Sequence, residues 1–563
     1  MYFGNQRKAK AIGAGIAAVA MLLPLAACGS NGAGSADPSS ITIYTMNATY
    51  EGALDGYVGK GIKDATGLSV NVVPDQVGGT SRFQTRLTTG DLGDIVIFSS
   101  REMLKDAIDA GVVEDLTQYK DQLKNAFRFT DGINRMKGLD DGKVYGIPTG
   151  VTNQKGQISK VDPTNAPSMR YDYYKELGSP EVKDYWDYAE VAEKMAQAHP
   201  KTEKGDNFYA LSLFGGWDQT SATQLRSISQ AYGWTNGDGI NSYNFVNIDP
   251  IAKKTEDLLA DGSTYMQALK WANGVYQAGQ LDPDSATQTW DDYLKKAEKG
   301  QSAMWVYGYM GNLNYNPANK DMTAQNKGYE RIPADSLNFV EGSSTLGGNW
   351  FWGLSSNAKN KEGALKFMNY MFSDEGSFTY EVGPKGVLWD LNKEGEPEFT
   401  ELGKKPWSTT DVPAKLGGGK ISDTFKFRVN ASTAGGVNPL YHATANYNEW
   451  NSTLKDNATS LDKEWTADHD GALNMKEYLV NNDKVKSFEV QNLDPLEWSD
   501  EEDVVIKSVG DVIKQYSWKM IYAKSDAEFT SLADEMVSKA KSLGYDKIVA
   551  KEDKAAQTFF NAL

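Results

Sequence analysis

The sequence predicts an α/β protein, because short apolar strands alternate with helical segments near the start of the chain. Ile41–Thr45 alternates β-branched residues, and Asp94–Phe98 is a nearly unbroken apolar run, as expected of a parallel strand buried on both faces. Between them, residues 52–67 suit a helix that ends at Gly67, and Leu68–Val73 suits a second strand. Strands that alternate with helices at this spacing are typical of an α/β sheet.

The same alternation continues along the rest of the chain. Further strands are predicted at 144–148, 209–214, 303–309 and 350–354, and further helices at 79–90, 103–110, 363–372 and 505–520. Ser525 and Glu528 have the spacing of a capping box for a last helix, and Gly544 fits the position just beyond its end.

The N-terminus has the features of a bacterial export signal. A basic start is followed by an apolar run at 11–25 and by Leu25-Ala26-Ala27-Cys28, which resembles the lipobox of bacterial lipoproteins. We therefore expect residues 1–27 to be a signal peptide, Cys28 to be lipidated, and 28–40 to be a flexible linker. The protein would then lie outside the cytoplasm and be anchored to the cell membrane only by its lipid. The alternatives are a secreted protein with an incidental cysteine, or an uncleaved anchor, for which the run is short.

Composition excludes several classes of function. Cys28 is the only cysteine, so no second thiol is present for a disulfide, a redox pair or a cysteine-based metal site. Only three histidines occur, far apart in sequence, and we expect neither a metal nor a cofactor. A formal net charge of -17 argues against nucleic-acid binding. The many aromatic residues (14 Trp, 29 Tyr and 20 Phe) supply rings on which sugars could stack.

Several stretches resemble one family. They are Gly90-Asp-Leu-Gly-Asp-Ile-Val96, Gly142-Lys-Val-Tyr-Gly-Ile-Pro148, Glu298-Lys-Gly-Gln-Ser-Ala-Met304, Ser355-Ser-Asn-Ala-Lys-Asn-Lys-Glu-Gly-Ala-Leu365, Val382-Gly-Pro-Lys-Gly-Val-Leu-Trp389 and the terminal helix pair from Glu501 to Gly544. In this order and behind a lipobox, they resemble the family 1 extracellular solute-binding lipoproteins of bacterial ABC importers, in particular the long carbohydrate-binding branch.

The resemblance implies a two-lobed fold of the periplasmic-binding-protein type (type II), with a hinge that the chain crosses more than once and a ligand cleft between the lobes. By its pattern, lobe one comprises 41–150 plus 331–372, and lobe two comprises 151–330 plus 373–563 with the C-terminal helices. The resemblance also implies a monomer that is not an enzyme and that delivers its ligand to the permease subunits of an ABC transporter. A ligand that touches both lobes would favour the closed state.

One departure from the long branch concerns calcium. Related long proteins often carry an EF-hand-like loop after the first helices of lobe two. The corresponding stretch here, His199–Phe208, lacks the alternating oxygen ligands that calcium needs. We therefore expect no calcium at this position.

Candidate ligand residues are the aromatic, amide, hydroxyl and charged side chains at the ends of predicted strands and in the long-branch loop. They are Asn47, Tyr50, Thr80, Arg82 and Ser100 in lobe one; Trp217, Asp218, Tyr307 and Tyr309 in lobe two; and Asn153, Asn349, Trp350, Lys385 and Trp389 at the crossings or in the long-branch loop.

Several of these aromatic residues have a second interpretation as core residues. Trp217 follows Gly215 and Gly216, so it could lie either in a cleft or in the core. The same two locations are possible for Trp350. Tyr307 and Tyr309 could form one wall of the site or simply one face of a strand. The other tryptophans in strand or helix patterns are assigned to packing: Trp186, Trp271, Trp290, Trp305, Trp352 and Trp518.

These observations favour a receptor for an oligosaccharide. Few cations lie near the proposed cleft, which favours a neutral, plant-type glycan over a uronate. A surface glycoside hydrolase or lyase is the first alternative, although this acidic chain shows no compact catalytic signature. A receptor for a non-sugar solute, such as a polyamine, iron or a peptide, is the second.

Overall fold

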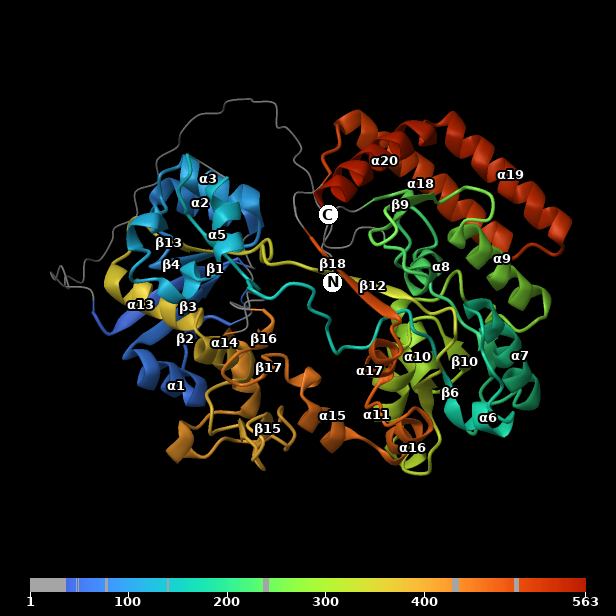
Figure 1. Cartoon of the computed structure of the whole chain (residues 1–563), viewed down its shortest axis with the longest axis horizontal. Coiled ribbons are helices and arrows are strands. Elements are labelled where there is room, and N and C mark those ends of the chain that lie inside the picture. The colour runs from blue at the N-terminus through green and yellow to red at the C-terminus, as the bar shows by residue number, and fades with distance from the viewer. Residues whose placement is uncertain are drawn as a thin grey trace, which may run out of the picture. The chain divides into compact units, whose positions relative to one another are not determined.

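The computed structural model describes residues 37–46, 48, 50–75, 79–138, 141–235, 243–427, 435–490 and 496–563. These residues form two α/β lobes, each with its own sheet and its own hydrophobic core (Figure 1). The predicted two-lobed α/β fold is therefore confirmed.

The first sheet has six strands in the order β2-β3-β1-β4-β13-β5. β1 lies parallel to β3 and β4, with Ile43 opposite Val72 and Ile95, whereas β13 runs antiparallel to both β4 and β5. Every residue of β4 is buried, as its apolar run predicts. The strands are β1 (Ser40–Thr45), β2 (Gly52–Ala53), β3 (Ser69–Pro74), β4 (Ile95–Phe98), β5 (Ile147–Pro148) and β13 (Phe351–Leu354).

Helices pack around this sheet, and capping residues fix their ends. Gly67, with φ 75°, ends α1 in the left-handed conformation and donates its N–H to the Lys63 carbonyl. The helices of this lobe are α1 (Gly56–Thr66), α2 (Gly79–Thr89), α3 (Arg101–Asp109), α4 (Lys124–Phe127), α5 (Thr130–Lys137), α13 (Lys361–Met371) and α14 (Asp374–Val382).

The second sheet has four strands in the order β11-β6-β10-β7, in which β10 is parallel to β7 and antiparallel to β6. Its strands are β6 (Ser168–Arg170), β7 (Tyr209–Leu211), β10 (Ser302–Trp305) and β11 (Tyr329–Arg331). A separate hairpin joins β8 (Val246–Asp249) to β9 (Lys254–Asp257). The surrounding helices are α6 (Tyr171–Glu176), α7 (Tyr188–Ala198), α8 (Thr223–Arg226), α9 (Thr264–Gln277), α10 (Trp290–Glu298), α11 (Asn316–Ala318) and α12 (Lys320–Thr323).

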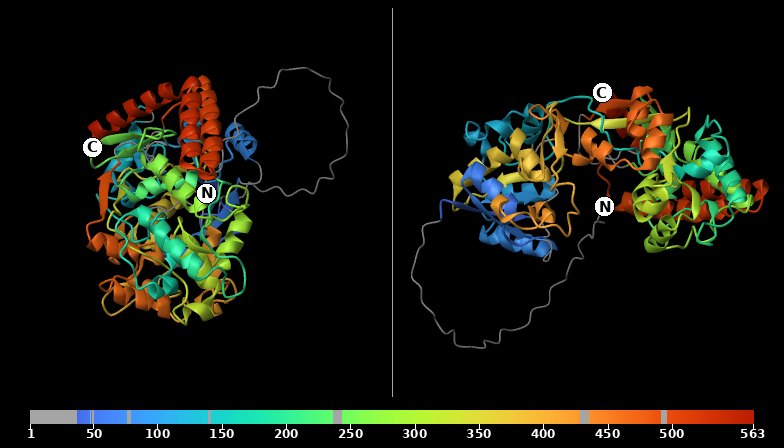
Figure 2. Two further views of the ribbon diagram at one scale, coloured as in Figure 1. Left: turned by 90° about the vertical axis from the view of Figure 1, so that its right-hand side faces the viewer. Right: turned by 90° about the horizontal axis from the view of Figure 1, so that it is seen from below.

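Three C-terminal helices pack against one another, as the left view of Figure 2 shows: α18 (Asp500–Ile521), α19 (Asp526–Ser542) and α20 (Tyr545–Ala562). One face of α18, including Val509 and Ile513, is buried in the second core, as its apolar periodicity predicts. Ser525 caps α19 by accepting a hydrogen bond from the Glu528 N–H, and Gly544 follows the end of α19 with φ 103°.

The chain passes between the two cores three times. We call residues 152–165, 340–350 and 451–460 the first, second and third crossing segments. The second begins within β12 (Phe339–Ser343), which pairs in parallel with β18 (Val485–Glu489). Beyond the third crossing lie α16 (Ser460–Asp468) and α17 (Met475–Asn481), and α15 (Asn451–Asn457) lies within it.

The packing corrects the predicted lobe boundaries. Residues 373–450 were expected in lobe two, but Tyr380, Leu388 and Ile421 belong to the core of the first sheet. The reason is that α14 packs beside α1 and α13, so that the apolar residues after α14 cover the same lobe. This region contains the short strands β14 (Trp389–Leu391), β15 (Pro397–Phe399), β16 (Val437–Asn438) and β17 (Ala443–Thr444).

The opposite correction applies to residues 331–339, which were expected in lobe one. Ile332 and Leu337 belong to the second core, because β11 is the edge strand of the second sheet and the chain leaves it along that lobe. The return to lobe one therefore begins only at β12.

Candidate ligand-binding site

A cavity of about 960 Å³ lies where the first two crossing segments meet the loop before the third. Its walls come from both lobes. Glu381 lies in α14 of the first lobe, whereas Gln230 and Trp234 lie in the second lobe. The cavity is lined by Gly150, Thr152, Gln154, Gln157, Ser159, Val161, Asp162, Pro163, Thr164, Gln230, Trp234, Thr235, Phe339, Val340, Glu341, Gly342, Ser343, Ser344, Glu381, Gly435, Gly436, Thr444, Ala445, Asn446, Asn448, Glu449 and Phe488. A change in the angle between the lobes would therefore change its shape.

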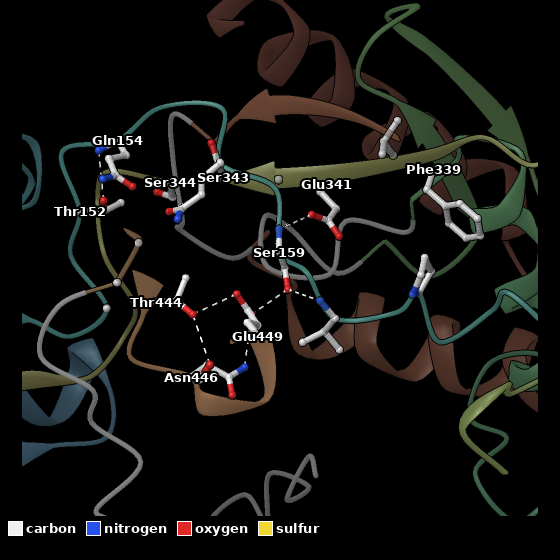
Figure 3. Close-up of a pocket in the computed structure, with 18 of the residues that line it drawn as sticks. Thr152, Gln154, Ser159, Phe339, Glu341, Ser343, Ser344, Thr444, Asn446 and Glu449 are labelled. Atoms are coloured by element: carbon white, nitrogen blue, oxygen red, sulfur yellow. Dashed lines mark hydrogen bonds between the residues drawn. The ribbon is translucent and has the colours of Figure 1, made fainter. Parts of the chain in front are cut away.

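Ser159 lies at the centre of a polar network in this cavity, between Glu341 of β12 and Glu449 (Figure 3). Its N–H donates to the Glu341 carboxylate at 3.1 Å, and its hydroxyl donates to Glu449 Oε1 at 3.0 Å. Glu449 also accepts hydrogen bonds from the Thr444 hydroxyl at 3.1 Å and the Asn446 amide at 3.2 Å. The network thus joins the first crossing segment to β12 and to the loop before the third crossing.

A second set of bonds fixes the first crossing segment to the β12–β18 pair. The Gly156 N–H donates to the Ser343 hydroxyl at 2.9 Å and to Glu489 Oε1 at 2.5 Å. The Ser343 hydroxyl donates in turn to the same Glu489 oxygen at 2.6 Å. Because β12 and β18 are themselves paired, the crossing segments are held to one another by polar contacts.

Acidic side chains outnumber basic ones in the lining of the cavity. Four carboxylates line it, and none of its described lining residues is a lysine, arginine or histidine. Two of the carboxylates have buried cationic partners: Glu341 pairs with Lys476, and Asp162 pairs with Arg331 Nε at 3.0 Å. The hydrogen bonds that hold Glu449 come from neutral groups. The cavity therefore carries a net negative charge and offers many hydrogen-bonding groups.

A second candidate feature is an aromatic group at the carboxyl ends of β7 and β10. Trp217 is 45% exposed, and its indole stacks on that of Trp290 with ring centroids 4.3 Å apart and planes at 26°. Tyr307 and Tyr309 stack at 5.7 Å and 14°, and Tyr307 lies 6.2 Å from Trp217. We call Trp217, Trp290, Tyr307 and Tyr309 the aromatic platform.

The sequence of residues 59–381, more than half of the 563 residues, matches the family of bacterial extracellular solute-binding proteins. The chain belongs to this family. Its members are binding proteins rather than enzymes, which agrees with the non-enzymatic function expected from the sequence. Comparison with curated protein sequences finds no match.

Solved structures similar to this solute-binding protein have the same fold. An HMO-binding, ABC-transporter-associated solute-binding protein from Bifidobacterium longum infantis is 14% identical, with 93% of this chain and 98% of that chain covered and a TM-score of 0.56. The FusA substrate-binding protein of an ABC transporter from S. pneumoniae, solved with kestose, is also 14% identical, with 92% and 99% covered and a TM-score of 0.52. At such identities, the similarity establishes the fold alone.

Two further observations on this solute-binding protein concern membranes and metals. Among the helices within the described part of residues 37–563, none has the length and apolar character that a membrane span requires. In the His199–Phe208 stretch, Glu203 is paired with Arg170 and Asp206 with Lys299, so both carboxylates have cationic partners. The described residues contain no group of three or more His, Cys, Asp or Glu side chains arranged to hold a metal ion.

Of the predicted ligand residues whose side chains the structure describes, none lines the large cavity. Asn153 lines a neighbouring cavity of about 130 Å³ and donates to the Arg128 carbonyl at 3.1 Å. Most of the cavity residues lie in crossing segments and loops, which have no periodic pattern, so sequence reasoning missed them. The expected boundary between the lobes at residues 150 and 151 was the one signal that pointed to this region.

The lobe-one candidates are distributed around the ends of β1, β3 and β4. Tyr50 donates to the Ala53 carbonyl and lies 5.2 Å from the Lys426 ammonium, and Arg82 reaches the Pro74 carbonyl at 3.5 Å. Ser100 is the N-cap of α3. Thr80 lies in the first turn of α2, and Asn47 lies outside the described residues.

The remaining candidates have structural partners. Asn349 accepts a hydrogen bond from Arg135, and half-buried Trp350 packs against the first core. Lys385 lies 3.7 Å from Asp390 and 6.0 Å from the Tyr441 ring. Trp389 is only 1% exposed and donates its indole N–H to the Gly383 carbonyl at 2.8 Å, so its assignment to an open site is wrong. It packs with Phe378, Tyr441 and Trp450 because residues 373–450 form an extra layer on lobe one.

Asp218 has an unusual environment beside the platform. Burial raises the pKa of its carboxyl to about 6, against the opposing effects of hydrogen bonds from the Trp518 indole and the Thr223 N–H and of the positive charge of Lys514. Trp518 and Trp290, which sequence analysis assigned to packing, are thus direct neighbours of the predicted residues Asp218 and Trp217.

Proposed function

We propose that this protein is the ligand-binding component of a bacterial ABC importer and that it captures a neutral, plant-type oligosaccharide without altering it. The observation that carries the proposal is the large polar cavity whose walls come from both lobes and from the segments that cross between them. The names of similar structures add support, because they describe ABC-transporter proteins that bind HMO or kestose.

The chemistry of the cavity suits a sugar. Each sugar hydroxyl can both donate and accept a hydrogen bond, and the lining supplies carboxylate acceptors, hydroxyls and five side-chain amides: Gln154, Gln157, Gln230, Asn446 and Asn448. Trp234, Phe339 and Phe488 add flat apolar surfaces. This combination of few aromatic faces and many oriented polar groups is what a hydroxylated ring requires.

The charge of the cavity supports a neutral ligand over a uronate. A carboxylate on the ligand would have to approach the lining carboxylates, among them Glu449, whose hydrogen bonds come from neutral groups and not from a cation. Repulsion between like charges is strengthened where water is excluded. We therefore place acidic sugars among the poor ligands.

Delivery requires the protein to signal that it is loaded. A ligand that contacts both walls of the cavity binds the closed arrangement of the lobes more tightly than the open one, and this difference in affinity drives closure. The closed, loaded protein would be the form that permease subunits recognise. We further propose that the protein acts as a monomer.

The predicted ligand residues outside the cavity remain part of the proposal. Trp217, Asp218, Tyr307 and Tyr309 would provide a second-lobe surface, and Asn47, Tyr50, Thr80, Arg82 and Ser100 a first-lobe surface, for further sugar units. Asn153, Asn349, Trp350 and Lys385 remain candidates as well. The polar groups of three of them already have partners within the protein, as do those of several residues on the two surfaces.

We also propose that Cys28 carries the lipid that holds the protein at the outer face of the cell membrane, with residues 28–40 as the spacer. Replacement of this residue, Cys28→Ser, should release the protein from the membrane fraction into the soluble extracytoplasmic fraction. Retention of the variant in washed membranes would contradict lipid anchoring without affecting the proposed ligand.

The function is tested by titration calorimetry of the purified chain from residue 29 onward. The panel contains neutral plant oligosaccharides, the corresponding uronic acid oligomers and spermidine. Saturable binding of a neutral sugar, with the sugar recovered intact, is expected. Tighter binding of spermidine would favour the non-sugar alternative, and new reducing ends would favour an enzyme.

A further inference from the structure

The loop between β7 and α8 carries Trp217, and its backbone lies against a residue of the C-terminal helix α18. At Gly215, an added Cβ would come within 2.9 Å of the Trp518 ring and 3.2 Å of its indole nitrogen. A larger residue at position 215 would force the loop or the Trp518 ring to shift. The backbone of the loop is therefore in close contact with the indole of Trp518.

A chain of hydrogen bonds then holds the residues on either side of Trp217. The Trp518 indole N–H donates to Asp218 Oδ2 at 2.7 Å, and Asp218 Oδ1 accepts from the Thr223 N–H at 2.8 Å. The Thr223 hydroxyl donates to the Trp217 carbonyl at 3.1 Å. The Asp218 carboxylate thus joins helix α18 to the loop that carries Trp217.

Trp290, on which Trp217 stacks, is also held in place by its surroundings. Trp290 is the first residue of α10, and the capping box formed by Thr289 and Asp292 holds that end of the helix. Phe214 contacts both indoles edge-on, with ring centroids 5.4 Å from each. The position of Trp217 relative to Trp290 therefore depends on the loop, and the loop depends on Trp518.

We propose that Trp518 is a positioning residue for the aromatic platform, acting through Asp218 to hold Trp217 stacked on Trp290. Trp518 lies beyond residues 59–381, the part of the chain that matches the family, so the C-terminal helices contribute to the site without lining it. The consequence for sugar binding rests on the proposed function, whereas the geometry does not.

The test uses far-ultraviolet circular dichroism, in which two stacked indoles produce an exciton couplet. The part of the couplet that is lost in Trp217→Phe or Trp290→Phe is assigned to the Trp217–Trp290 pair. Trp518→Phe keeps an aromatic ring against Gly215 but lacks the N–H donor, and we expect it to weaken the same part of the couplet. Trp498→Phe, which removes an indole under Lys551 and away from the loop, is the matched control and should leave that part intact.

Variants at Asp218 make the test independent of the folding of Trp518→Phe. Asp218→Asn keeps an oxygen acceptor and should retain more of the couplet than Asp218→Ala. For a sugar that binds the unmodified protein, Trp518→Phe and Asp218→Ala should weaken affinity about tenfold, as expected for loss of a hydrogen bond to a charged group.

The two proposals fail in different ways. An unchanged couplet in folded Trp518→Phe and Asp218→Ala overturns the positioning role, whether or not a sugar binds. A weakened couplet in a protein that binds no sugar supports the positioning role and contradicts the proposed function instead. A weakened couplet with unchanged sugar affinity supports the positioning role and contradicts the assignment of the platform to the sugar site.

Discussion

Glu449 accepts a hydrogen bond from the Ser159 hydroxyl at 3.0 Å, although the two residues are 290 positions apart in the sequence. Ser159 lies in the first crossing segment, and Glu449 lies just before the third. The bond therefore connects two separate passages of the chain between the lobes. It also places a carboxylate with neutral hydrogen-bond donors in the wall of the cavity of about 960 Å³.

Glu449 should control discrimination against acidic sugars. Glu449→Gln keeps the shape of the side chain and removes its charge, so we expect the difference in affinity between a neutral oligosaccharide and its uronic acid counterpart to narrow, by about tenfold at most. Calorimetric titration of both sugars measures the change. Glu394→Gln, at an exposed turn, is the matched control; equal effects of the two substitutions would contradict the role of Glu449.

Trp389 and Trp217 should respond oppositely to truncation. Trp389→Ala removes a buried indole and its hydrogen bond to Gly383, and we expect a loss of about 3–5 kcal/mol in the free energy of unfolding. Trp217→Ala removes a half-exposed ring and should change stability by about 1 kcal/mol or less, while weakening sugar binding more than about tenfold. Urea denaturation and calorimetry separate the two effects. A large stability loss in Trp217→Ala with intact affinity would place that ring in the core.

Glu552 should make stability depend on pH. Burial raises the pKa of its carboxyl from 4.5 to about 7, although the N–H groups of Asn244 and Phe245 donate to it and act in the opposite direction. Because the folded state binds the proton more tightly than the unfolded state, the stabilisation is complete below about pH 4.5 and is lost as the pH rises through about 7. The group can change the free energy of unfolding by up to about 3 kcal/mol.

Glu552→Gln isolates this contribution. The variant should show a flatter dependence of the free energy of unfolding on pH between 4.5 and 7 than the unmodified protein, as measured by urea denaturation at several pH values. Identical slopes for the two proteins would mean that Glu552 has the same proton affinity in the folded and unfolded states.

The strands were predictable where burial alone determines them. The run of β4 is apolar because both of its faces are covered, and the first residues of β1 alternate between half-buried and buried positions. The helix ends at Gly67 and Gly544 were also predictable from neighbouring residues, because a left-handed backbone conformation favours glycine. These features depend on residues that are close in sequence.

The site was less predictable, because it depends on contacts between distant residues. Nothing near Trp389 in the sequence indicates that residues 373–450 pack on the first lobe and bury it. Trp217 could be placed at the end of a strand, but its neighbours Trp290 and Trp518 come from two other helices. The cavity itself is formed by segments from several parts of the chain, and only the fold brings Ser159, Glu341 and Glu449 together.

The most direct test of the central claim measures the distance between the lobes. The chain from residue 29 onward contains no cysteine. Spin labels can therefore be attached to two introduced cysteines, Lys105→Cys in α3 and Lys194→Cys in α7, both at exposed positions. Distances between the two labels are measured by electron–electron double resonance with and without a neutral oligosaccharide that binds. We predict a shift of the distance distribution when the sugar is bound, and no shift with a sugar that does not bind. An unchanged distribution at saturating sugar would contradict the account.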